Sequence, residues 1–323
     1  MLENVEYALA WTSLKFLGLL PRSSARSVGA HLASLLFRLQ PRWRQIALFN
    51  LQLAFPGSTE AERSKIVRDM VRNLGWLAAE FAHLPQYNRG NIEDVIVLDG
   101  FENFAAAENQ GKGVLFLTGH MGAWELKPYA HALYHRPIYF VIRPINNPRV
   151  DALVNRYRSG SGNQPIEKKH AARAIVKALR HGGVVGILAD QNAALEDSVF
   201  VDFLGIPAAT TTGIARMARH SGAPVVPVYS YWDSVLRKYR LRYEPALTLT
   251  RTDDEERDIR DYVVQFNEAL GSYVRRFPDQ WFWVHRRWKT RPIGEDPIYP
   301  DLRLETVASE PQTHEAASVG GKR

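Results

Sequence analysis

Cysteine is absent from all 323 residues of the sequence. A thiol nucleophile, a thiolate metal site, an acyl intermediate on cysteine and disulfide bonds are therefore all excluded. The absence also suits a reducing compartment. Any group that this protein transfers has to be attacked by another kind of side chain.

Several familiar catalytic motifs are missing as well. No G-x-S-x-G sequence is present, so a serine hydrolase would lack its nucleophile elbow. Gly111-Lys112-Gly113 lacks the later residues of a phosphate-binding loop. His131 and His135 have the i, i+4 spacing of a metal pair on a helix, but no HExxH motif and no third ligand accompany them. We expect no metal site.

A long membrane-spanning run is also lacking. The stretch from Val5 to Leu20 is strongly apolar, but Glu6 and Lys15 interrupt it and it is shorter than the ~20 residues of a comfortable span. A signal peptide is disfavoured, because a charged n-region and a cleavage site are missing. Arginines follow at positions 22, 26, 38, 42 and 44. This pattern predicts a helix that lies on an anionic membrane, the alternative being a buried core helix.

The composition is that of a basic globular protein, with 46% apolar residues and a formal net charge of +7. The charge indicates an anionic partner, which could be nucleic acid, acidic lipid or an acidic carrier protein. Arginines are scattered among Trp, Leu and Phe rather than gathered into dense basic runs. We therefore expect lipid and carrier protein as partners, and no nucleic acid.

Three regions follow from the pattern along the chain. Residues 1–94 are predicted to form helices that associate with the membrane, and residues 301–323 a disordered tail. In residues 95–300, β-rich runs at 114–118, 138–142, 184–190 and 224–230 alternate with helical stretches. This alternation predicts a mixed α/β domain with a largely parallel sheet flanked by helices. Residues 236–243 alternate as a half-exposed or edge strand would, and 258–276 are predicted to be helical.

The most informative segment is Gly119-His120-Met121-Gly122-Ala123-Trp124-Glu125, which lies where a strand ends and a helix begins. Five helical residues rotate two side chains about 140° apart, so His120 can meet Glu125 only from before the first turn. Gly119 and Gly122 permit that bend. We predict His120 as a general base whose other nitrogen is held by Glu125. For an isolated pair, a structural histidine and a surface glutamate would be the more common interpretation.

This segment resembles the H-x4-D/E signature of glycerolipid and lipid A acyltransferases. Further blocks are similar to the lipid A late-acyltransferase family and occur in its order. They are FVIRP at 140–144 with Asn147-Pro148, ADQ at 189–191, VFVDFLG at 199–205 with ATTTG at 209–213, PVVPV at 224–228 and WFWVHRRW at 281–288. The resemblance covers nearly the whole chain, and several ordered blocks are far more specific than one motif.

The resemblance implies roles for several other residues. Arg143 corresponds to an arginine that contacts a phosphate of the acceptor or the donor. Asp190 is expected to anchor Arg143 or to orient His120, with a purely structural cap as the alternative. Backbone amides at the Gly122 corner, or Arg143, would contact the oxyanion or a phosphate. Thr210, Thr211 and Thr212 are expected to cap a helix.

An aromatic and basic cluster near the end of the chain contains His285 and Arg286. These two residues are expected to bind substrate by facing membrane phosphates or an acidic acyl carrier protein.

The implied reaction is direct acyl transfer, without an acyl-enzyme and without a cofactor, because an acyl thioester is already activated. The expected donor is acyl carrier protein or acyl-CoA, and the expected acceptor is a hydroxyl of a lipid A precursor. The expected location is the cytoplasmic face of a cell inner membrane. Two alternatives remain: a lysophospholipid or glycolipid acyltransferase with the same residues, and a non-catalytic lipid-binding module.

Overall fold

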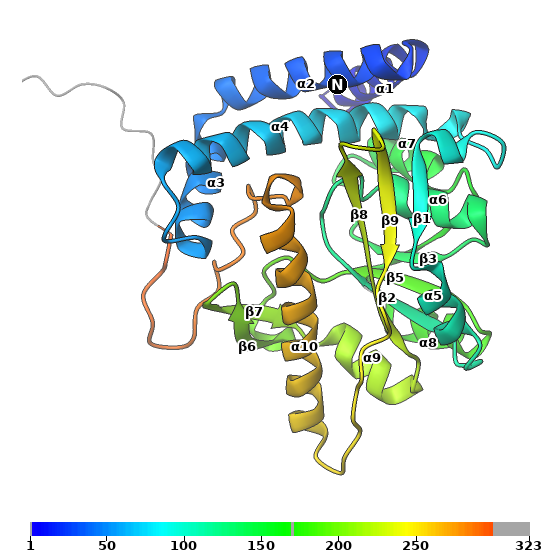
Figure 1. Ribbon diagram of the computed structural model, residues 1–323, viewed down its shortest axis with the longest axis vertical. Coiled ribbons are helices and arrows are strands. Elements are labelled where there is room, and N and C mark those ends of the chain that lie inside the picture. The colour runs from blue at the N-terminus through cyan, green and yellow to red at the C-terminus, as the bar shows by residue number, and fades with distance from the viewer. Residues whose placement is uncertain (1, 169–170, 300–323) are drawn as a thin grey trace, which may run out of the picture.

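A computed structural model describes residues 2–168 and 171–299, and the tail expected at 301–323 lies outside these ranges. Figure 1 shows the N-terminal helices at one end of the molecule and a twisted sheet with the other helices below them. The first region holds α1 (Leu2–Leu19), α2 (Arg22–Leu39), α3 (Pro41–Ala54), α4 (Glu60–His83) and the short 3-10 helices η1 (Leu84–Gln86) and η2 (Ile92–Asp94). The strands begin after this region, at Ile96.

The two long helices α2 and α4 cross in backbone contact (Figure 1). A Cβ atom at Gly29 would lie 2.3 Å from the carbonyl oxygen of Gly75, so both positions need glycine. The start of α4 is fixed by a capping box, in which Thr59 and Glu62 each accept a hydrogen bond from the other's backbone amide. The helical region is therefore held by close packing and by a locally encoded helix start.

Seven strands form the main sheet in the order β1-β9-β8-β2-β5-β3-β4. Their bounds are β1 (Ile96–Asp99), β2 (Val114–Thr118), β3 (Tyr139–Ile142), β4 (Gln164–Glu167), β5 (Val184–Leu188), β8 (Val225–Asp233) and β9 (Lys238–Tyr243). All neighbours are parallel except β8 and β9. The predicted mixed, largely parallel sheet is confirmed, and the four β-rich runs correspond to β2, β3, β5 and β8.

Strand β9 corrects one detail of the prediction. Tyr239, Leu241 and Tyr243 are buried and alternate with half-buried residues, as the period of two requires. The strand is not at an edge, however, because β1 pairs in parallel along its outer side. A separate hairpin of β6 (Ser198–Phe203) and β7 (Ile206–Thr211) was not predicted as strands.

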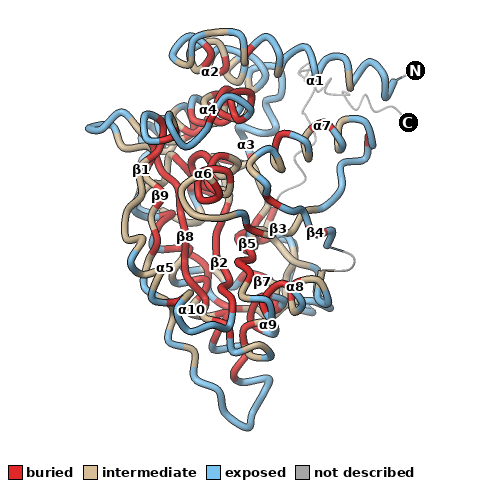
Figure 2. The backbone as a smooth tube through the Cα atoms, turned by 90° about the vertical axis from the view of Figure 1, so that its right-hand side faces the viewer, coloured by how far each residue is buried: buried red, intermediate tan, exposed pale blue. Residues whose placement is uncertain are grey.

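Helices cover both faces of the sheet. Their bounds are α5 (Phe101–Glu108), α6 (Leu126–Tyr134), α7 (Pro148–Arg158), α8 (Ala171–Arg180), α9 (Gly213–Ser221) and α10 (Glu255–Arg276). Leu115 and Leu117 of β2 pack in a cluster with residues of α8, α9 and α10, while Val114 and Phe116 pack with residues of α5 and α6. Figure 2 shows these buried strands running through the middle of the molecule. Alternating residues of one strand thus serve two apolar layers.

The helical region is not separate from this core. Val67, Met70 and Val71 of α4 belong to the same cluster as Leu115 and Leu117. The chain therefore folds around continuous apolar contacts that join the N-terminal helices to the sheet.

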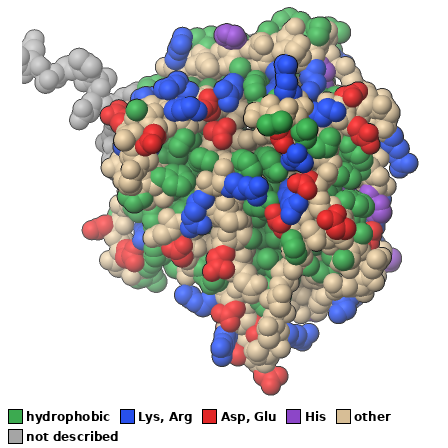
Figure 3. All heavy atoms as spheres, viewed as in Figure 1, with side chains coloured by type: hydrophobic (Ala, Val, Ile, Leu, Met, Phe, Trp, Pro, Cys, Tyr) green, Lys and Arg blue, Asp and Glu red, His purple; other side chains and the backbone are tan. Residues whose placement is uncertain are grey.

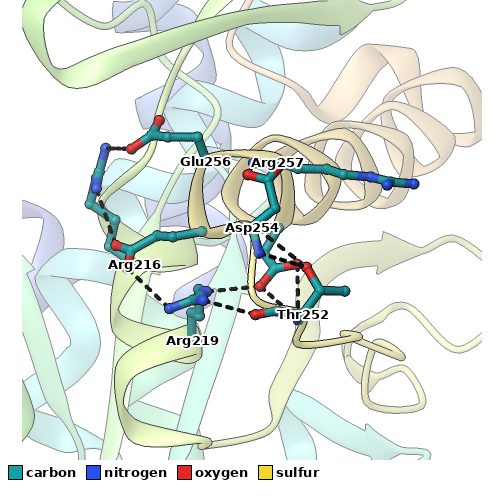
Figure 4. Close-up of polar contacts among 8 residues, drawn as sticks. Arg216, Arg219, Thr252, Asp254, Glu256 and Arg257 are labelled. Atoms are coloured by element: carbon teal, nitrogen blue, oxygen red, sulfur yellow. Dashed lines mark hydrogen bonds and ion pairs between the residues drawn. The ribbon is translucent and has the colours of Figure 1, made fainter.

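A polar cluster fixes the start of α10 against α9 (Figure 4). Asp254 caps the helix by accepting a hydrogen bond from the amide of Arg257. Asp258 accepts hydrogen bonds from Arg219 and Thr252. Burial acts to raise the pKa of Asp258, but these partners hold that pKa at about 2. The cluster therefore has a structural role, because it holds the start of α10 against α9.

The predicted capping role holds only for Thr211, whose hydroxyl accepts a hydrogen bond of 3.3 Å from the amide of Gly213, the first residue of α9. Thr210 and Thr211 are in β7, and Thr212 precedes α9 without a side-chain hydrogen bond to its amides. Thr210 instead accepts a hydrogen bond of 2.5 Å from Arg287, which is fully buried. The threonine hydroxyl therefore helps to satisfy a buried guanidinium.

Helix α1 is tied by polar contacts to the loop before α7. The side-chain amide of Asn147 donates to the carbonyl of Glu3 and to the carboxylate of Glu6, both at 2.8 Å. Arg149 donates to the side-chain oxygen of Asn4 at 2.6 Å and lies over the ring of Tyr7. These contacts join the first helix to the segment that follows β3.

Candidate active site

A cavity of about 200 Å³ lies between α6 and the sheet. Part of its lining is polar, with His120, Glu125, Lys127, Arg143 and Arg158. The apolar part extends inward along the strands to Phe116, Gly186 and Phe140, which stand in register on β2, β5 and β3. The polar residues are at or beyond the carboxyl ends of these strands, where open α/β sheets bind ligands.

His120 is held by Asp190. Its Nδ1 lies 2.8 Å from Oδ1 of Asp190, and its backbone amide donates to Oδ2 at 2.8 Å. Asp190, which is 2% exposed, also accepts a hydrogen bond of 2.7 Å from the indole of Trp281. A carboxylate only accepts hydrogen bonds, so Nδ1 carries the proton and Nε2 keeps its lone pair.

Burial acts to raise the pKa of Asp190, but the imidazole of His120 and the hydrogen bonds from His120 and Trp281 hold that pKa well below its usual value. Asp190 is therefore ionised at neutral pH. Asp190 was predicted either to anchor Arg143 or to orient His120. The observed hydrogen bonds match the second of these roles.

The prediction that Glu125 holds His120 is corrected by the structure. Glu125 forms a two-pronged ion pair with Arg158 of α7, with distances of 2.8 Å from Nε to Oε2 and 2.5 Å from Nη2 to Oε1. Glu125 is the last residue before α6, and its carboxylate points toward α7. The ring nitrogen of His120 that Glu125 was predicted to hold, Nδ1, faces Asp190 instead. His120 does lie before the first turn, as the spacing argument required.

Gly122 provides the bend but not the predicted amide contact. Its φ of +52° favours glycine, and a Cβ atom there would lie 2.3 Å from the carbonyl oxygen of Ser230. Its N–H donates to the carbonyl of Gln280 at 2.8 Å. Because that amide is already used, it is not free to contact an oxyanion, and Gly122 lies outside the cavity lining.

Arg143 follows β3, is exposed and lines the cavity, so it stands at the mouth. His285 and Arg286 are not among the lining residues. Nε2 of His285 accepts the amide hydrogen of Asn192 at 2.8 Å, and burial lowers the pKa of His285 to about 4. Arg286 lies 5.6 Å from the ring centre of Tyr299. The substrate-binding role expected for these two stays a prediction.

Arg158, Lys127 and Trp281 were missed as site residues. Arg158 stands in the last turn of α7, 33 positions after its partner Glu125, and no local motif connects the two. Trp281 was noted only as part of an aromatic block. Lys127 lies at the start of α6, two positions after Glu125. An exposed lysine would be usual there, but the side chain of Lys127 is buried.

Comparison with known proteins decides the family. The model of the bacterial lipid A biosynthesis acyltransferase family matches residues 2–290. The chain belongs to that family. As a member, it is an acyltransferase of lipid A biosynthesis.

Similar members of the family differ in the acyl chain that they are named for. The lipid A biosynthesis lauroyltransferase of Escherichia coli (strain K12) is 30% identical over 297 residues, covering 91% of this chain and 95% of that protein. The palmitoleoyltransferase of the same organism is 29% identical with the same coverage. Its myristoyltransferase is 26% identical over 296 residues, 91% of this chain and 90% of that protein.

Proposed function

We propose that this acyltransferase moves a fatty acyl chain from acyl carrier protein or acyl-CoA onto a hydroxyl of a lipid A precursor. The observation that carries the proposal is the position of His120. Asp190 occupies its Nδ1, and the ring lines a cavity that continues into an apolar space. A base beside an apolar space suits transfer of an acyl group to a hydroxyl.

In the proposed reaction, Nε2 of His120 takes the proton of the acceptor hydroxyl, whose oxygen attacks the thioester carbonyl. Asp190 stabilises the imidazolium that forms. Collapse of the tetrahedral intermediate expels the thiolate, which takes the proton from His120. The fork of Arg143 at the mouth suits a phosphate of the donor or the acceptor. Glu125 holds Arg158 in place beside the cavity.

The function is tested with purified protein, acyl carrier protein or CoA thioesters and two acceptors, a lipid A precursor and a lysophospholipid. Transfer to the lipid A precursor supports the proposal, and the better of the two thioesters identifies the donor. Transfer to the lysophospholipid alone would favour the alternative acyltransferase. Failure with every thioester and acceptor would favour a lipid-binding module.

The apolar part of the cavity is proposed to hold the acyl chain. Gly186 lies in register between Phe116 and Phe140 and leaves space there, since a Cβ atom would meet Cδ1 of Ile138 at an ordinary 3.5 Å. Gly186→Val should fold and fill part of this space. We expect kcat/KM to fall about 10-fold or more for the longest chains and less for short ones, because one methylene in an apolar pocket changes rates by roughly 10- to 200-fold.

The measurement is kcat/KM for a series of saturated acyl thioesters of increasing length. Gly57→Val is the matched control, because a Cβ atom at Gly57 would meet nothing within 4 Å. An equal effect of Gly186→Val on all chain lengths would show that the chain binds elsewhere.

The N-terminal helices carry the surface that we propose contacts the membrane. Within the described residues, each helix is too short or too polar to cross a bilayer. Figure 3 shows hydrophobic side chains mixed with Lys and Arg along the upper edge of the molecule, where α1 and α2 lie. The exposed apolar residues of α1 and α2 are Leu2, Val5, Leu9, Trp11, Phe16, Leu19, Leu32, Leu35, Leu36 and Leu39. Apolar residues among exposed basic ones suit an anionic lipid surface, proposed as the cytoplasmic face of the inner membrane.

Introducing charge on α2 should weaken membrane binding. Leu32 and Leu36 are 47% and 53% exposed and are spaced i, i+4 on one face. The double variant Leu32→Glu, Leu36→Glu is expected to bind anionic vesicles about 10²-fold more weakly, since each leucine gives roughly 1.5–3 kcal/mol when fully buried.

Vesicle sedimentation at low and high salt measures this effect. The control is Val235→Glu with Ile293→Glu, which changes two residues that are 89% and 96% exposed outside the N-terminal helices. Equal binding by the two double variants would remove α2 from the contact surface.

A further inference from the structure

Lys127 is a buried amine inside the active-site cavity. Its side chain is only 7% exposed and lines the same cavity as His120. Nζ donates a hydrogen bond to the hydroxyl of Thr118, at the carboxyl end of β2. An ammonium group has three donors, so this bond leaves two for other partners.

The carboxylates that act on the charge of Lys127 are engaged by other groups. Asp190 accepts from His120 and Trp281, and Glu125 is paired with Arg158. Burial lowers the pKa of Lys127 to about 7, against the opposing charges of Asp190 and Glu125. The amine therefore changes its charge near neutral pH.

The proposed reaction needs a donor for the oxyanion, and Gly122, Arg158 and Arg143 are poorly placed. Gln191, whose Nε2 lies 3.5 Å from Nε2 of His120, is not among the residues that line the cavity. The amide of Gly122 is bonded to Gln280. The guanidinium of Arg158 uses Nε and Nη2 on Glu125, and Arg143 is exposed at the mouth. Lys127 is instead enclosed, where a donor that needs no reorganisation stabilises developing charge most strongly.

We propose that Lys127 donates a hydrogen bond to the carbonyl oxygen of the acyl thioester and stabilises the oxyanion; this rests on the proposed function. When the acceptor oxygen bonds to the carbonyl carbon, its proton passes to Nε2 of His120 and the carbonyl π pair moves onto the oxygen beside Lys127. Collapse restores the double bond and breaks the carbon–sulfur bond. The leaving thiolate takes the proton from His120, and Lys127 keeps its own protons throughout.

The decisive variant is Lys127→Met, which keeps the length and removes the donor. We expect kcat to fall about 10²- to 10³-fold, the usual effect of losing one oxyanion donor. KM for both substrates should change by no more than about threefold, because the hydrogen bond is weak to the uncharged carbonyl and strengthens only as negative charge develops on the oxygen. Thr118→Val is the matched comparison, because it breaks the same hydrogen bond but keeps the amine. It is expected to lose less than about 10-fold.

The pH dependence gives a readout that a structural role would not move. The titratable and charged groups around the amine are His120, His131, Asp190, Glu125, Arg158 and Arg143; burial lowers the pKa of His131 to about 3, so His131 does not change its charge near pH 7. Because the ammonium form is the better donor, wild-type kcat should fall as the pH rises through about 7. This falling limb should be absent from the residual activity of Lys127→Met.

The outcomes separate this proposal from the proposed function. Failure of the wild-type protein to transfer an acyl group would contradict the proposed function itself. Normal wild-type turnover with Lys127→Met within about threefold of it, or equal losses in Lys127→Met and Thr118→Val, would overturn the role of Lys127 alone. If thermal unfolding shows that Lys127→Met does not fold, Lys127→Leu, which also lacks a donor, replaces it in the same comparison. The same limits then apply to its kcat.

Discussion

His120→Ala is expected to lower kcat by about 10²- to 10⁴-fold, the usual contribution of a positioned general base. The loss should appear in kcat rather than in KM, because His120 takes a proton only as the hydroxyl attacks. Folding should survive, since the ring is partly exposed and Asp190 keeps its hydrogen bonds from the backbone amide at position 120 and from Trp281. Steady-state rates with the donor and acceptor from the function test, together with thermal unfolding, measure both parts.

His181→Ala serves as the control for this variant. His181 is exposed and bonds only to the carbonyl of Lys177 one turn earlier, so its loss should leave turnover unchanged. Turnover by His120→Ala close to that of this control would show that the acceptor hydroxyl is deprotonated by another group, and the proposed mechanism would have to be abandoned.

Asp190→Asn is expected to lower kcat by roughly 10³- to 10⁴-fold, as an amide does beside the catalytic histidine of a serine protease. Asp190 Oδ2 accepts from both the backbone amide of His120 and Trp281, so the single oxygen of asparagine should take that place. Its NH₂ group then faces Nδ1, which has to become an acceptor. The proton moves to Nε2, and the nitrogen that faces the substrate loses its lone pair.

Glu125→Gln is the comparison that separates the two carboxylates. It leaves every hydrogen bond of His120 intact but weakens the pairing with Arg158, so we expect a loss of only about 10-fold. Rates for both variants at several pH values, with circular dichroism as a check on folding, make the test. A larger loss in Glu125→Gln than in Asp190→Asn would restore Glu125 as the carboxylate that supports the base.

The sequence pointed to His120 as the base and favoured Glu125 as its support, with orientation of His120 given only as one of the possible roles of Asp190; the sheet explains why. In the parallel pair β2 and β5, Thr118 stands opposite Leu188. His120 and Asp190 each lie two residues beyond those positions, so the register brings them together. Both follow an apolar run, a signal visible in the sequence. Glu125 was nearer along the chain, and only knowledge that β2 and β5 are neighbours would have favoured Asp190.

Other features depended on contacts that local patterns do not report. Residues 236–243 alternate in the same way whether the strand is at an edge or covered by β1. The β6–β7 hairpin turns at Leu204 and Gly205, both with positive φ, and its Thr210 looked like a helix cap because α9 begins shortly afterwards. A lysine at position 127 reads as a solvent-facing helix residue until the fold encloses it. Sequence periodicity predicted the main strands and helices. The wrong predictions concern residues whose surroundings are set by segments distant in the sequence.

The hydrogen bonds between α1 and the segment at the start of α7 link the position of the first helix to the position of the cavity mouth. Asn147 and Arg149, which bond to that helix, follow Arg143 of the cavity lining by four and six positions. On the proposed membrane surface, the depth at which α1 settles among the headgroups would set the height of the mouth above the lipid. A hydroxyl on an embedded acceptor reaches Nε2 of His120 only at a matching height. The first helix would then determine how deeply the protein sits in the membrane. A variant in which α1 sits too far from the lipid is expected to bind vesicles normally but to have a low kcat.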